Sequence, residues 1–270
     1  MLSEDRLPKR VFSFDYKPNG KLAQFTIRMR NVPGAMQWQT QTIAKHGVNI
    51  LSGFTDAPSS AEEAVWSFFA DFDHADVEPE SLATELRAVN FVLDVQCRAS
   101  DNGFTADSMH FPVTIGNEPA VIIRTRMLTS IIQKIKELFG FESYSAQVIL
   151  RQIGQASARA AFEGTRAVTG LDFMKRNTRD AISLYAALGW GLLDLTAIDF
   201  DAKTAEFYLK GGFEYTYSRN RSHQSQCFFI SGMLAGWTSL LFETNMDVTE
   251  VLCQAKGDAF CVFRLQPTKA

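Results

Sequence analysis

Residues 99–119, ASDNGFTADSMHFPVTIGNEP, contain glycine, proline and many polar residues and show no sustained hydrophobic period. Such a stretch is typical of a boundary between domains. A chain of 270 residues is long enough for two domains that each bury a core of their own. We therefore expect one domain before this stretch, over residues 20–98, and another after it, over residues 110–266.

The composition, with 46% hydrophobic and 21% charged residues, is that of a globular protein and excludes a disordered chain. Twenty-two phenylalanines, against six tyrosines and four tryptophans, supply aromatic surface without a hydrogen-bonding group, which suits thick cores or an apolar pocket. A formal net charge of −3 gives no long-range attraction to phosphate, so we expect no direct nucleic-acid partner.

The first residues, MLSEDRLPKRVF, lack the pattern of a signal peptide, and no run approaches the roughly 20 apolar residues of a membrane span. We therefore expect a cytoplasmic protein without a membrane partner. In a reducing compartment, the four cysteines are expected as metal ligands or core residues and not as disulfides.

The sequence before the boundary predicts the element order βαββαβ. LAQFTIRMR, from Leu22, alternates as a strand does, and the turn Asn31-Val32-Pro33-Gly34 leads into a helix that ends at Gly47. Two further strands follow, the second being the aromatic-rich AVWSFFADF. A helix over residues 79–89 and a strand over residues 91–97 complete a ferredoxin-like unit.

N-V-P-G-A-M, followed by a helix and then by G-V-N-I, resembles the ACT domain, a small regulatory module, over about residues 20–98. In that family the turn after the first strand commonly helps to bind an amino acid between paired domains, which corresponds here to Asn31, Gly34 and Asn49. The family more often has aspartate at the position of Asn31. The alternative is that the Pro33-Gly34 turn and Asn49 are purely structural.

The sequence after the boundary predicts helices first and strands afterwards, which favours an α+β domain. Helices are expected up to Gly140, from Tyr144 to about Thr165 with a break at Gly154, and over residues 178–188. Strands are expected in GWGLLDLTAIDFD, TAEFYLKG and FEYTYS. Neither a glycine-rich phosphate loop nor a G-x-S-x-G turn is present, so the sequence favours a binding protein over an enzyme.

The C-terminal sequence predicts a last helix from about Ser225, with Gly232 and Gly236 leaving a groove along it, and then a β-hairpin. Cys253 and Cys261 are equally distant from Gly257, so simple antiparallel pairing places them opposite one another, with Cβ atoms about 4.5 to 5.5 Å apart. Two thiolates on one tetrahedral zinc ion need sulfurs only about 3.8 Å apart. The hairpin can supply that spacing.

Cys227 and Glu250 would complete a four-ligand site without an open position for a catalytic water. Glu250 lies three residues before Cys253, and on a regular strand these two side chains point to opposite faces, so the strand has to bend between them. The cysteines as core residues, a disulfide, Glu250 as a solvated charge, and His223 as a ligand are the alternatives.

S-G-M-L-A-G-W and T-E-V-L-C-Q-A-K-G-D-A-F-C-V-F-R resemble the end of a 4-vinyl reductase domain, also called hydrocarbon-binding, and the resemblance covers about residues 110–266. Its members include the sensor halves of aromatic-responsive transcription activators, in which a cysteine, a glutamate and two further cysteines hold zinc in this order. The resemblance therefore implies a zinc site at Cys227, Glu250, Cys253 and Cys261.

The same resemblance implies a small hydrophobic or aromatic ligand enclosed between helices and sheet, beside the zinc. Candidate lining residues are Trp190, Phe207, Tyr215, Phe229 and Trp237. We expect a regulatory small-molecule sensor, and a homodimer because both families commonly pair. The alternatives are an enzyme or accessory protein of tetrapyrrole or aromatic metabolism, and a structural assembly subunit.

Overall fold

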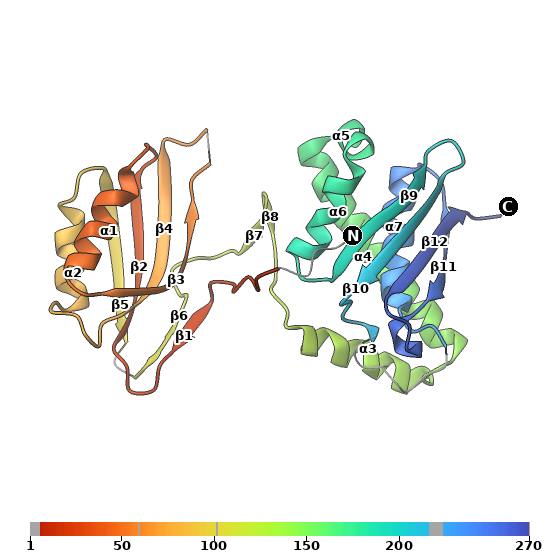
Figure 1. The fold of residues 1–270 in the computed structure, drawn as a ribbon, viewed down its shortest axis with the longest axis horizontal. Helices are drawn as coiled ribbons and strands as arrows, with labels where there is room; N and C mark the ends of the chain where they lie inside the picture. Colours follow the sequence, from red (N-terminus) through yellow and green to blue (C-terminus); the bar gives the residue numbers. More distant parts are fainter. Residues whose placement is uncertain (1–5, 59, 101, 216–223, 270) are drawn as a thin grey trace. The chain divides into compact units, whose positions relative to one another are not determined.

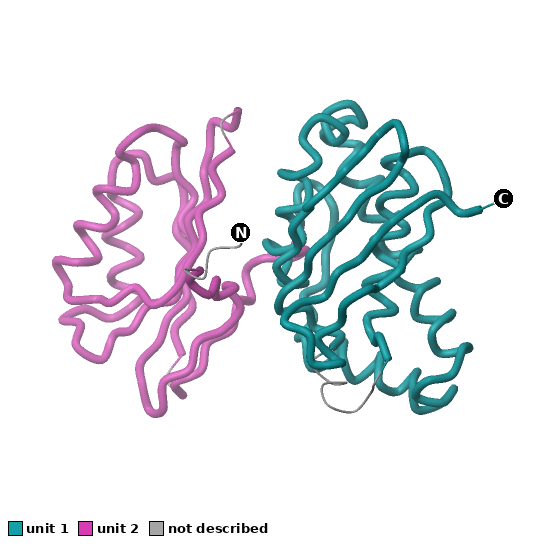
Figure 2. Tube along the Cα trace, turned by 45° about the vertical axis from the view of Figure 1, so that its right-hand side comes forward, with its two compact units in different colours: residues 1–4, 115–270 teal, residues 5–114 magenta. Residues whose placement is uncertain are grey.

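The computed structural model describes residues 6–58, 60–100, 102–215 and 224–269. The chain divides between Thr114 and Ile115 into two compact units, coloured separately in Figure 2. We call residues 5–114 the N-terminal unit and residues 115–270 the C-terminal unit. The expected boundary stretch includes this division but is not wholly irregular, since it contains β6 (Phe104–Ala106), β7 (Thr114–Ile115) and β8 (Glu118–Pro119).

The N-terminal unit has the predicted order βαββαβ, built as a four-stranded antiparallel sheet, β3-β4-β2-β5, with both helices on one face (Figure 1). Alternation along the sequence places Phe25, Ile27 and Met29 in the core beneath the helices. The elements are β2 (Leu22–Arg30), α1 (Ala35–Lys45), β3 (Asn49–Asp56), β4 (Glu63–Asp71), α2 (Pro79–Arg87) and β5 (Val92–Ser100). A ribbon of β1 (Phe14–Tyr16) and β6 was not predicted.

His46 follows α1 and joins it to two other segments of the N-terminal unit. Its Nδ1 lies 2.7 Å from Asp76 Oδ1, and its Nε2 lies 2.7 Å from Glu85 Oε2 on α2. Hydrogen bonds to these two carboxylates, Asp76 first, raise the pKa of His46. The protonated imidazole therefore fastens the end of α1 to α2.

The C-terminal unit is the predicted α+β domain, with a four-stranded antiparallel sheet in the order β11-β12-β10-β9. Figure 1 shows the helices α4 and α7 lying against this sheet. The helices are α3 (Thr125–Phe139), α4 (Tyr144–Thr169), α5 (Leu171–Arg176), α6 (Thr178–Ala187) and α7 (Phe228–Leu241). The strands are β9 (Leu192–Asp199), β10 (Thr204–Lys210), β11 (Met246–Leu252) and β12 (Cys261–Pro267).

The expected break of α4 at Gly154 is wrong, because α4 runs without interruption through that residue. A Cβ atom at Gly154 would collide with the backbone oxygen of Phe229 on α7, and one at Gly232 would collide with that of Arg151 on α4. The predicted groove beside Gly232 and Gly236 is therefore filled by the backbone of α4. The glycines serve close helix packing and not a bend.

The third expected strand of this unit is also wrong in its described part, because residues 213–215 form a turn; residues 216–218 lie outside the described residues. The turn carries Glu214 into the protein, where its carboxylate accepts hydrogen bonds from the N–H groups of Phe229 and Ile230 at 2.9 and 3.0 Å. No helix among the described residues combines the length and the apolar character needed to cross a membrane.

Candidate metal centre

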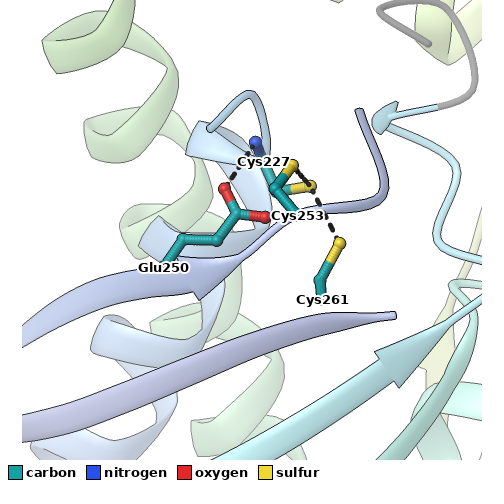
Figure 3. A group of neighbouring side chains, drawn as sticks. All are labelled: Cys227, Glu250, Cys253 and Cys261. Atoms are coloured by element: carbon teal, nitrogen blue, oxygen red, sulfur yellow. Dashed lines mark hydrogen bonds between the residues drawn. The ribbon is translucent and has the colours of Figure 1, made fainter. Parts of the chain in front are cut away.

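Four side chains from different parts of the C-terminal unit converge at the start of α7 (Figure 3). Cys227 is the N-cap residue of α7, Glu250 belongs to β11, Cys253 directly follows β11, and Cys261 begins β12. One ligand atom from each residue lies within 4.8 Å of all the others. Every residue of the sequence-derived set is therefore present in one cluster, which we call the Cys3Glu cluster.

An irregularity in β11 brings Glu250 and Cys253 to the same side. Glu250 pairs with Phe263, and Leu252 pairs with the neighbouring Val262, so the register shifts and one strand has an extra residue, Val251. A β-bulge of this kind changes the direction in which the following side chains point. It supplies the bend that the spacing of Glu250 and Cys253 required.

The expected cross-strand pairing of Cys253 with Cys261 is wrong. The ladder ends at the pair Leu252 and Val262, and Cys253 leads into the short 3₁₀ helix η2 (Gln254–Lys256). Gly257 follows η2 with φ of 101°, a left-handed conformation that glycine adopts without a steric penalty. The two cysteines approach one another across a wider connection than a tight hairpin.

The cysteine sulfurs lie close together but are not bonded to one another. Cys227 Sγ lies 3.7 Å from Cys261 Sγ and 4.0 Å from Cys253 Sγ. All four cysteines of the chain are free thiols, so the alternative of a disulfide is not realised in the structure. Cys97, which lies apart from the cluster on β5, is partly buried, and burial raises the pKa of its thiol to about 12.

The acid–base properties of the Cys3Glu cluster are strongly altered by burial and proximity. Burial, followed by the charge of Cys253, raises the pKa of Glu250 to about 8. Hydrogen bonds from Cys227 and Cys261 lower the pKa of Cys253, whereas the pKa of Cys227 is raised, chiefly by its hydrogen bond to Cys253. The cluster favours one thiolate, and further ionisation needs a compensating positive charge.

The unused oxygen of Glu250 tests whether the cluster fits a cation. Glu250 Oε2 accepts a hydrogen bond from the N–H of Cys227 at 3.2 Å. Its Oε1 is buried and has no hydrogen-bond partner among the described residues. A buried carboxylate oxygen normally has a partner, and a metal ion is one such partner. The Cys3Glu cluster could therefore hold a metal ion.

Backbone and side-chain hydrogen bonds fix the cysteine ligands in place. The N–H of Gln254 donates to Cys261 Sγ at 3.3 Å, and the N–H of Cys253 donates to Asp258 Oδ2 at 2.7 Å. Asp258 was not anticipated from the sequence. Its position one residue after Gly257 was the available signal, because short acidic side chains commonly accept backbone hydrogen bonds in turns.

A buried charged group next to the Cys3Glu cluster was also missed. Lys136 on α3 is 2% exposed, and its Nζ donates at 3.1 Å to both the backbone oxygen and Oε1 of Gln226, which precedes Cys227. Lys136 lies four residues after Ile132 and so shares the apolar side of its helix. A charge within that side was the signal, but it did not reveal a partner distant in sequence.

The predicted pocket residues belong to one aromatic core but do not form a single group. Phe207 and Phe229 are buried in the main core of the C-terminal unit, and Trp190, Tyr215 and Trp237 pack against it. The rings of Trp190 and Phe229 are stacked, with centroids 6.1 Å apart. Trp237 also meets Phe162 edge to face at 5.9 Å, in a smaller cluster. Whether these residues line a ligand pocket stays a prediction.

The predicted effector residues of the N-terminal unit do not meet within one chain. Asn31 donates from Nδ2 to the backbone oxygens of Pro58 and Ala61, and Gly34, with φ of 83°, begins α1. Asn49 pairs opposite Asp71, at the far end of β4 from these two residues. The nine residues of β4 span about 30 Å, so only a second chain could bring Asn49 to that turn.

His223, the alternative metal ligand, lies outside the described residues. The Cys3Glu cluster therefore consists of the four residues that the described part of the chain brings together.

Comparison with known proteins gives one family match. The family model of the vinyl-4-reductase domain, the 4-vinyl reductase domain of the sequence resemblance, matches residues 216–267, which is less than half of the chain. No curated protein matches the sequence.

Several solved structures resemble parts of the chain at low sequence identity. The phenol-responsive sensory domain of the transcription activator PoxR has 17% identity, covers 57% of this chain and 79% of its own, and has a TM-score of 0.47. A vinyl-4-reductase family protein from Methanocaldococcus jannaschii has 18% identity, 56% and 85% coverage, and a TM-score of 0.38.

The ACT domain from the GTP pyrophosphokinase of Chlorobium tepidum has 21% identity, covers 28% of this chain and 96% of its own, and has a TM-score of 0.24. None of the three TM-scores is high enough to establish a shared fold. The family assignment therefore rests on the vinyl-4-reductase match over residues 216–267, the segment that contains all four residues of the Cys3Glu cluster.

Proposed function

We propose that the C-terminal unit is a small-molecule-binding sensor domain stabilised by a structural zinc ion on Cys227, Glu250, Cys253 and Cys261. The observation that carries the proposal is the convergence of these four ligand atoms within 4.8 Å. Sulfurs bound to one tetrahedral zinc ion lie about 3.8 Å apart. The two measured separations from Cys227 Sγ, 3.7 and 4.0 Å, agree with that value.

The donor set favours zinc and a structural role. Thiolates select soft or borderline metal ions, whereas magnesium and calcium prefer oxygen ligands. Four protein ligands close a tetrahedral site, so no position is left for a catalytic water. A bound zinc ion would tie the start of α7 to β11 and β12 and would contribute to the free energy of folding.

A small apolar or aromatic ligand is the proposed input of this domain. The match of residues 216–267 to the vinyl-4-reductase domain supports it, since the family resemblance implies such a ligand. The core around Trp190, Phe213 and Phe229 supports it further, because these three rings contact one another and present apolar aromatic surface. The N-terminal unit is proposed to be an ACT-like regulatory or dimerising module.

Elemental analysis combined with native mass spectrometry of the full chain tests both parts of this proposal. We expect about one zinc ion per chain in the wild type and in the matched control Cys97→Ser, and loss of zinc in Cys253→Ser and Cys261→Ser. An additional small mass retained under gentle conditions would support the binding role. A wild-type protein without metal would refute the zinc assignment, and a metal-loaded protein that binds no small molecule, even from a panel of phenols and hydrocarbons, would refute the sensor role.

A further inference from the structure

Lys136 is a lysine buried in an apolar region of the C-terminal unit. Its Nζ lies 5.4 Å from the centre of the Phe228 ring and 5.7 Å from that of Phe141. A buried ammonium group is unfavourable unless it is paired and hydrogen-bonded. The position of Lys136 therefore calls for an account of what its charge is paired with.

One peptide group connects Lys136 to Glu250. Lys136 Nζ donates to the backbone oxygen of Gln226 at 3.1 Å. That oxygen belongs to the peptide bond between Gln226 and Cys227, whose N–H donates to Glu250 Oε2 at 3.2 Å. Hydrogen bonds at the two ends of one peptide group polarise it in the same direction and strengthen each other. The ammonium group thus supports the orientation of a predicted metal ligand that it does not touch.

Gln226 also reaches a second ligand of the Cys3Glu cluster. Its backbone N–H forms a hydrogen bond with the sulfur of Cys253. Its side-chain Oε1, like its backbone oxygen, accepts from Lys136 Nζ at 3.1 Å. Lys136 therefore holds Gln226 at two atoms, and Gln226 in turn contacts Cys253 and precedes Cys227. Three of the four cluster residues depend on the position of this one glutamine.

The charge of Lys136 complements the charge that a metal-loaded cluster would carry. Zinc with three thiolates and one carboxylate has an excess of negative charge. Glu214, which is 1% exposed and accepts hydrogen bonds at the start of α7, adds a further carboxylate in the same interior. The N-terminus of α7 offsets part of this negative charge, and Lys136 supplies a full positive charge.

We infer that Lys136 is a positioning residue for the metal centre: through Gln226 it orients Cys227, Glu250 and Cys253, and its ammonium group balances the negative charge of the zinc-loaded cluster. The inference rests on the proposed zinc site. Groups that surround metal ligands commonly change metal affinity by about 10- to 100-fold when they are removed. A structural role limited to holding α3 against α7 would have no such effect.

Zinc affinity of the full-length protein, measured by competition with a chromogenic chelator, tests the inference. Lys136→Met removes the charge and the donors while retaining an apolar side chain of similar length, and we expect it to bind zinc about 10- to 100-fold more weakly. Lys136→Arg, which keeps charge and donors, should recover most of the affinity. Lys134→Met is the matched control, because Lys134 lies on the same helix with its side chain 66% exposed.

Two further measurements separate positioning from stability. Thermal unfolding of the metal-free proteins should show no loss of stability in Lys136→Met, and the charge-transfer bands of the cobalt-loaded proteins should shift in Lys136→Met and not in Lys134→Met. If Lys136→Met does not fold, Lys136→Gln takes its place. Unchanged zinc affinity and cobalt spectrum in a wild type that binds zinc would overturn this inference alone, whereas a wild type that binds neither metal would overturn the zinc proposal with it.

Discussion

The two units of this protein place their polar groups in different ways. In the N-terminal unit the largest fully buried side chains include Phe25, Phe68 and Phe69, and the charged groups pair near the surface, as His46 does. In the C-terminal unit Lys136 and the three cysteines of the Cys3Glu cluster are buried among aromatic side chains. The N-terminal unit can be stabilised by apolar burial alone, whereas the C-terminal unit has to neutralise buried charge.

Unpartnered buried atoms sharpen this difference. In the N-terminal unit Gln39 Oε1 is such an atom, but it belongs to a neutral amide whose Nε2 lies 3.8 Å from Met29 Sδ. In the C-terminal unit Glu250 Oε1 belongs to an ionisable carboxyl group. An uncompensated buried charge is far more costly than an unpartnered amide oxygen. A bound cation would therefore stabilise the C-terminal unit and leave the N-terminal unit unaffected.

Metal removal is the strongest test of this contrast. Treatment with a chelator should lower the stability of the C-terminal unit by up to on the order of 10 kcal/mol, because binding to deprotonated cysteines contributes directly to folding. Hydrogen–deuterium exchange should then increase in α7, β11 and β12 but not in β2 to β5. Equal loss of protection in both units, or in neither, would contradict the contrast.

Closing the contact between α4 and α7 should have a smaller effect on the same unit. Gly232→Ala places a methyl group against the backbone of Arg151, and we expect the free energy of unfolding to fall by about 1 to 3 kcal/mol in urea denaturation. Ala160→Ser, at an exposed position of α4, should change it by less than about 0.5 kcal/mol. A Gly232→Ala protein as stable as the wild type would show that the helices can separate at no cost.

The pH dependence of His46 should affect only the N-terminal unit and should be the smallest of the three effects. The pKa of His46 is raised in the folded state, so its stabilising contribution is complete below the unfolded value of about 6.5 and is lost as the pH rises through the raised value. Exchange protection of α1 and α2, relative to His46→Gln at the same pH, should decrease from about pH 5.5 to about pH 8.5. An advantage over the variant that is independent of pH would mean that the ring does not titrate in this range.

The sequence predicted most elements of both units because their hydrophobic periods are regular, as in β2 and α3. It also identified the four residues of the Cys3Glu cluster. It failed where contacts distant in sequence decide the local conformation. A glycine within a helix suggests a break, but Gly154 lies where another helix packs against it. The bulge at Val251 and the link from Lys136 to Gln226 likewise depend on partners that no local pattern specifies.

The close contact between α4 and α7 also has a mechanical consequence. Because backbone meets backbone at Gly154, Gly232 and Gly236, no flexible side chains lie between the helices at these points to absorb a displacement. The two helices have to move together. The Cys3Glu cluster is fixed to the start of α7, and α4, with 26 residues, is about 39 Å long. A shift of the cluster would be carried as a rigid-body motion along the whole length of α4.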